Sequence, residues 1–319
     1  MLAAGHQRLG HQRSGPPRAG APRVWLGVLF DAVALALASG VLFGGLAVGL
    51  RRGVAAVPDA ELGAFQNQLI GFLTALTIAA VTLQLGDATW AAIWPFLVLG
   101  TIVPGITQVM FAQSVRHIGA SRAMVILGMI PLASGFVAVV IFDEPFRIAL
   151  LLGTFLVVGG GMALVWERVR PPNYRAIGVA WALASIALFA GRDNVSRWVT
   201  SDRDVPPFAA AAALLGGAAL TVGIYLIVTR TPKVAFSQVR TSVKPFLLSS
   251  VMLGGAYCLF LAAIDRGRVT TVSPLSGTFV LWTVVFSAIF LRQLEAISKR
   301  LLIAAILVLA GAAVVAATR

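Results

Sequence analysis

A charged and amide triplet, Arg192-Asp193-Asn194, interrupts an otherwise apolar stretch of this sequence. A guanidinium binds carboxylates and other anions, a carboxylate binds ammonium groups or protons, and a carboxamide both donates and accepts hydrogen bonds. An earlier segment, residues 42–51, begins like residues 188–197 and also ends in arginine, but it has Leu46-Ala47-Val48 at the corresponding place. The difference predicts chemistry in one copy of a repeated element that the other copy lacks.

Two interpretations of the triplet stay open. In the first, Arg192, Asp193 and Asn194 face a wet cavity and bind substrate, since a charge inside a membrane span costs about 2.5–3.5 kcal/mol and marks functional positions. In the second, the long side chain of Arg192 reaches the membrane interface, and Asp193 pairs with Arg197 one helical turn later.

Gln108, Tyr257 and Trp282 are further candidates for binding a substrate. Thr107-Gln108 and Tyr257-Cys258 occupy equivalent positions in two matching segments. If they act on substrate, Gln108 and Tyr257 face each other across a cavity, and the Trp282 ring suits a planar or cationic solute. Hydrogen bonding between helices is the alternative for the first two, and simple packing is the alternative for Trp282.

The composition indicates a membrane protein. Of 319 residues, 59% are hydrophobic and only 12% are charged, which is too little charge to cover a soluble domain. The net charge of +13 comes from basic residues spread between apolar tracts, so we expect no nucleic-acid binding. One cysteine and three scattered histidines predict no metal site. No motif indicates a cofactor or catalytic residues.

The elements that must position these residues are ten tracts free of Asp, Glu, Lys and Arg. A membrane-spanning helix needs about 20 apolar residues, and only helices satisfy the backbone of such continuous apolar segments in lipid. We therefore predict an all-α integral membrane protein with ten transmembrane helices in a lipid bilayer. The tracts are 32–50, 62–86, 88–115, 123–142, 148–166, 176–191, 205–229, 245–264, 269–291 and 301–318.

The order of the tracts predicts two domains. Residues 1–23, rich in Gly, Pro, Gln and Arg, are predicted to form a disordered basic tail. Residues 24–170 and 171–319 match in register, as Gly105 with Gly255 shows, and are predicted to be two five-helix repeats. Because five is odd, the second repeat is inverted relative to the first. Inverted repeats enclose a cavity near the bilayer midplane that opens to either side.

Prolines are expected to shape three of these helices. Pro104-Gly105, Pro131 and Pro274 lie within apolar tracts. A proline inside a helix removes a backbone hydrogen bond and clashes with the preceding turn. We predict kinks in the third, fourth and ninth helices, which could act as hinges or expose carbonyl groups.

Residues 119–165 resemble the EamA-type domain of the drug/metabolite transporter superfamily. The resemblance lies in small residues entering a helix, an L-x-x-x-P-L-like centre at 127–132, Glu144 in the next turn and a glycine-studded final helix. The second copy departs from it, with Trp282 where Pro131 aligns. The resemblance implies ten helices, cytoplasmic termini and a cavity lined mainly by helices 1, 3, 4, 6, 8 and 9. Lys and Arg are spread almost evenly over both sides, so charge does not fix the orientation.

These observations predict a secondary transporter, an exporter of a small polar metabolite such as an amino acid or similar zwitterion, working by alternating access. We expect a monomeric multi-pass protein of a bacterial inner membrane, with a small-molecule substrate and no cofactor. Protons are a candidate coupling ion through Asp193. A membrane-embedded enzyme acting on lipid and a non-transporting membrane subunit of the same fold remain the alternatives.

Overall fold

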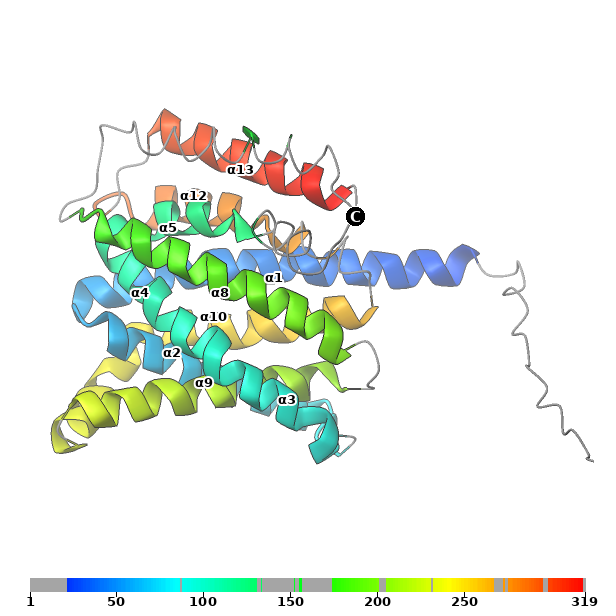
Figure 1. Ribbon diagram of the computed structural model, residues 1–319, viewed down its shortest axis with the longest axis horizontal. Helices are drawn as coiled ribbons and strands as arrows, with labels where there is room; N and C mark the ends of the chain where they lie inside the picture. Colours follow the sequence, from blue (N-terminus) through cyan, green and yellow to red (C-terminus); the bar gives the residue numbers. More distant parts are fainter. Residues whose placement is uncertain are drawn as a thin grey trace, which may run out of the picture.

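The computed structural model describes residues 22–86, 88–130, 133, 152, 155–156, 174–200, 205–230, 232–266, 272, 275–294 and 298–317. All regular structure in these ranges is helical (Figure 1). The helices are α1 (Pro22–Ala56), α2 (Ala60–Val81), α3 (Trp90–Gly100), α4 (Thr107–Ile118), α5 (Ala120–Leu127), α8 (Ile177–Thr200), α9 (Pro207–Thr229), α10 (Pro232–Arg266), α12 (Phe279–Phe290) and α13 (Lys299–Ala317).

The predicted all-helical class is confirmed over this part of the chain. Five segments are long and apolar enough to cross a membrane: Asp31–Ala56, Ala60–Val81, Trp90–Ile118, Pro207–Thr229 and Ser237–Arg266. Each predicted tract except the fifth contains a helix. The fifth tract, 148–166, lies almost entirely outside the described residues, so the count of ten spans stays a prediction.

The third predicted span is a broken helix. A π-helical turn over Thr101–Ile106 separates α3 from α4, and Val103 has φ −134° and ψ 111°, which are not helical angles. The ring of Pro104 crowds the backbone of the residue before it and disfavours the helical conformation there. The predicted kink at Pro104-Gly105 is therefore confirmed, while Pro131 and Pro274 lie outside the described residues.

The helices of the two predicted repeats pack largely against each other. Helix α1 packs along α10 and α12, as α4 and α5 pack along α8. Helix α2 packs against α10, as α9 packs against α3, and α2 and α9 also pack against one another. Contacts between the repeats thus have counterparts with the roles exchanged, as expected of repeats related by a twofold axis.

The helices define two ends of the molecule. Pro22 of α1 and Ala317 of α13 lie at the same end, on the right of Figure 1. We call it the terminal end. At the opposite end, α1 leads into α2 and α9 leads into α10, and we call this the distal end. The start of α1 and the end of α13 on one side agree with an even number of spans.

Candidate functional site

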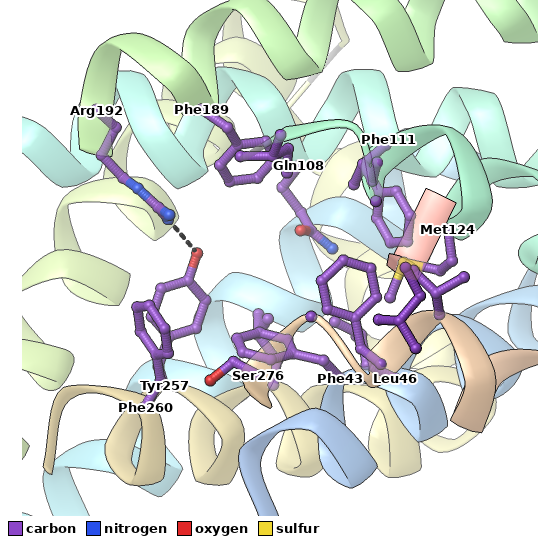
Figure 2. Close-up of a pocket in the computed structure, with 18 residues that line it drawn as sticks. Phe43, Leu46, Gln108, Phe111, Met124, Phe189, Arg192, Tyr257, Phe260 and Ser276 are labelled. Atoms are coloured by element: carbon purple, nitrogen blue, oxygen red, sulfur yellow. Dashed lines mark hydrogen bonds between the residues drawn. The ribbon is translucent and has the colours of Figure 1, made fainter. Parts of the chain in front are cut away.

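A cavity of about 140 Å³ lies between the two predicted repeats. Its lining comes from α1, α4 and α5 of the first predicted repeat, from α8, α10 and residues 276–280 of the second, and from Leu309 of α13 (Figure 2). In chain order, the first six of these segments occupy helices 1, 3, 4, 6, 8 and 9. That is the set of helices that the resemblance predicts around a central cavity.

Equivalent residues of the two repeats line this cavity together. Phe43 of α1 corresponds to Phe189 of α8, and Leu46 corresponds to Arg192 at the same sequence offset. All four residues contribute to the lining. In Figure 2 the α8 pair lies on one wall and the α1 pair on the facing wall. The two matching segments, one hydrocarbon and one charged, therefore meet at a single site.

Arg192 lies in the wall of the cavity and not at the end of its helix. Its Nη1 atom is 3.5 Å from the hydroxyl oxygen of Tyr257, at the outer limit for a hydrogen bond. Its guanidinium carbon is 4.9 Å from the centre of the Phe189 ring, within range of a cation–π contact. This position is compatible with the cavity interpretation, and substrate binding by Arg192 stays a prediction.

Gln108 and Tyr257 reach the same cavity from α4 and α10. Each side chain is only 4% exposed, and the Tyr257 ring packs edge-on against Phe43 with 5.5 Å between ring centres. The buried Nε2 of Gln108 has no hydrogen-bond partner among the described residues. An unpaired buried donor costs about 1–3 kcal/mol, so this amide favours a ligand that accepts its hydrogen bond.

Comparison with known proteins identifies the family. Residues 31–166 and 176–317 each match the model of the EamA-like transporter family. The chain belongs to the EamA-like transporter family. The two matches fall within the two predicted repeats and, with the apolar helices, make this chain a multi-pass membrane protein of a drug/metabolite transporter family.

A solved structure supports the fold of this EamA-like transporter. A crystal structure described only as that of a protein is 18% identical in sequence, and the match covers 89% of this chain and 94% of the other with a TM-score of 0.57. At that identity the likeness shows the fold alone. In sequence, no curated protein matches the chain.

The remaining predicted site residues are not placed in the described lining of the cavity. Asp193 and Asn194 belong to α8, but their side chains lie outside the described residues, so their roles stay predictions. Trp282 is 37% exposed, 5.8 Å from Phe286 between ring centres, and its Cβ packs on Gly44 of α1. That placement fits the packing alternative for Trp282, because depth within a tract does not determine which face of the helix a residue occupies.

Sequence reasoning missed the aromatic walls of the cavity in this EamA-like transporter. Phe43, Phe111, Phe189 and Phe260 all line it, yet none was singled out, because phenylalanine is common throughout the spans. The available signal was the equivalence of Phe43 and Phe189, two aromatic residues retained at one position of the repeat next to the divergent triplet.

A cluster of charged side chains joins the two predicted repeats at the distal end. Arg230, just after α9, bonds Asp59 at 2.7 and 3.0 Å and Glu61 at 2.9 Å. Burial works to raise the pKa of Asp59, but hydrogen bonds from Arg230 and the Leu62 N–H outweigh it, so this pKa lies below its usual value. Hydrogen bonding to Asp59 in turn raises the pKa of Arg230.

Proposed function

We propose that this protein is a secondary transporter that exports a small zwitterion, such as an amino acid, across a bacterial inner membrane by alternating access. The observation that carries the proposal is the cavity between the two repeats, with Arg192 and Tyr257 at one end and the unpaired Gln108 amide in the same lining. A half-buried cation and an unpaired buried donor line the same cavity, as in sites that bind small anionic groups.

In this proposal Arg192 binds the carboxylate of the solute. The aromatic groups of Phe189 and Tyr257 hold the guanidinium over the cavity, so that little side-chain freedom is lost when the anion binds. Gln108 donates to the same head group, and this bond is strong because its acceptor is charged. Asp193, on the same helix, is the candidate partner for the solute ammonium group or for a coupling proton.

The packing of the helices supports the proposed alternating access. The buried side chains of Leu50, Val115, Ile118 and Phe246 fill the space toward the distal end, so the cavity in this conformation lies on the terminal side of that core. Because the contacts between the repeats occur in exchanged pairs, a second conformation with the two ends interchanged uses the same interfaces. Ion or solute gradients drive the exchange.

Transport by purified protein in liposomes tests the proposal. We expect flux of labelled amino acids that falls at least about 100-fold in Arg192→Ala, since the charged hydrogen-bonding partner of the carboxylate is lost. Arg240→Ala removes an exposed arginine of α10 and is the matched control, with flux unchanged. Equal flux in both variants overturns the role of Arg192. Absence of flux with turnover of the liposome lipids favours the enzyme alternative.

A further inference from the structure

The two repeats supply unlike groups to equivalent positions of the cavity. Leu46 and Arg192 correspond in sequence, and both line the cavity. In Figure 2, Leu46 lies with Phe111 and Met124 at one end, whereas Arg192 and Tyr257 lie at the other. The cavity therefore has an apolar end and a charged end, although the backbone around it is nearly symmetric.

The apolar end offers no partner for a polar body. Among the described lining residues, the only polar side chains are Gln108, Arg192, Tyr257 and Ser276. A hydroxyl or a second charge placed against Leu46, Phe111 and Met124 loses its water without gaining a hydrogen bond. A hydrocarbon group placed there instead gains by leaving water. The lining thus discriminates against solutes that are polar at both ends.

The size of the cavity limits the apolar group. Its volume of about 140 Å³ is close to the ~150 Å³ of an engineered apolar cavity that holds one benzene molecule. Part of that space is needed for the head group at Arg192. The remaining space fits a branched aliphatic group more readily than a fused ring system.

We propose that the cavity selects amphipathic carboxylates, with the carboxylate at the Arg192 end and a compact uncharged apolar body at the Leu46 end. This inference rests on the proposed transport function and adds the orientation and class of the solute. A zwitterionic amino acid and a simple carboxylic acid share this chemistry, so the experiment includes both.

Binding measured by the rise in melting temperature of the detergent-solubilised protein tests the solute class, because a ligand of the folded state stabilises it by an amount that grows with the logarithm of its concentration relative to its Kd. The probes are leucine, 4-methylpentanoate, serine, glutamate and 3-methylbutylamine. We expect leucine or 4-methylpentanoate to bind at least about 10-fold more tightly than serine and glutamate, because one additional hydrocarbon group in an apolar pocket contributes about that factor in affinity. The amine, which has the same body without the carboxylate, is expected not to bind.

The outcomes separate the two proposals. Equal binding of leucine and serine, with flux of both, overturns the selectivity for an apolar body and leaves the transport function intact. Binding of the amine as tight as that of 4-methylpentanoate overturns the placement of the carboxylate at Arg192. Absence of both binding and flux for every carboxylate overturns both proposals.

Two variants of Leu46 locate the apolar end. Leu46→Ala enlarges it, and we expect the preference for leucine over phenylalanine to shift about 10-fold toward phenylalanine. Leu46→Ser is expected to reduce the preference for leucine over serine about 10-fold. A reversed preference cannot arise from misfolding, and Leu220→Ser, at a 57% exposed position of α9, is the matched control. Unchanged preferences in both Leu46 variants overturn the inference.

Discussion

The two ends of the α2–α9 pair are built alike but are held together differently. At the distal end, Arg230 reaches from the end of α9 to Asp59 and Glu61 at the start of α2. At the terminal end, the equivalent residue Gln84 reaches from the end of α2 and accepts one hydrogen bond, 2.9 Å, from the N–H of Phe208 in α9. The geometry is repeated, but among the described residues a charged cluster holds one end and a single neutral acceptor holds the other.

This difference distinguishes the two ends of a molecule built from two related repeats. Two identical repeats would make the two end-closed conformations equal in free energy. Equivalent positions of the two repeats differ. Gln84 against Arg230 gives the two ends of the α2–α9 pair unequal contacts, and Leu46 against Arg192 gives the cavity an apolar end and a charged end. In the proposed mechanism the fold supplies two conformations, and a few divergent side chains set their balance and their ligand.

The largest expected effect comes from making the repeats alike in the cavity. Arg192→Leu gives the second repeat the residue of the first, and we expect flux in liposomes to fall about 100-fold or more, because the only charge in the described lining is lost. The double exchange of Leu46→Arg with Arg192→Leu moves the charge to the other pole. Recovery of about 10-fold over the single variant supports the symmetry of the site, and no recovery argues against it.

Two equivalent glycines provide the next test. A Cβ at Gly217 of α9 would overlap the backbone carbonyl of Leu97, whereas a Cβ at Gly71 of α2 would have its nearest neighbours at 3.4 Å, an ordinary contact. We expect Gly217→Ala to lower the free energy of unfolding by about 2–3 kcal/mol through overpacking, and Gly71→Ala to change it little. Denaturation in detergent measures both, and equal losses would contradict the asymmetry.

The charged cluster gives a smaller effect. Arg230→Gln places at the distal end the residue found at the terminal end. We expect a loss of about 2 kcal/mol in the free energy of unfolding, because the carboxylates of Asp59 and Glu61 lose their shared cation at a half-buried site. Arg240→Gln, at an exposed position, is the control. A change no larger than that of the control would show that the charged cluster does not contribute to the free energy of unfolding.

The same cluster predicts a dependence on pH. Since the pKa of Asp59 is lowered in the folded protein, its contribution is complete above the ordinary carboxyl pKa of about 4 and is lost as the pH falls through the lowered value. Melting temperatures between pH 3 and pH 6 are expected to show this loss in the natural protein. The loss should be smaller in Arg230→Gln, and an identical pH profile in both proteins would count against the assignment.

The smallest expected effect is at the neutral end. Gln84→Ala leaves the N–H of Phe208 to water, and we expect a loss of about 0.5–1 kcal/mol in the free energy of unfolding, the range for a single exposed or half-exposed hydrogen bond. Thermal melting in detergent measures it beside Arg230→Gln. A loss as large as that in Arg230→Gln would show that the two ends are equally held.

The sequence reveals those features that a membrane makes costly. Arg192, Gln108 and Tyr257 were singled out because polar groups are rare at that depth, and the structure places all three on one cavity. The break at Pro104 also follows from local chemistry. The placement of Trp282 does not follow from local chemistry. The face that it occupies depends on the close approach of Gly44, which is a contact between distant segments.

The interrupted third span has a mechanical consequence. The non-helical angles of Val103 divide that span into two short rods, α3 and α4, while its counterpart α10 runs unbroken through 35 residues. An interrupted helix bends at a lower cost in free energy than a continuous helix. We therefore expect movement that reshapes the cavity to be larger in the amino-terminal half, where α4 carries Gln108, than along α10, which carries Tyr257.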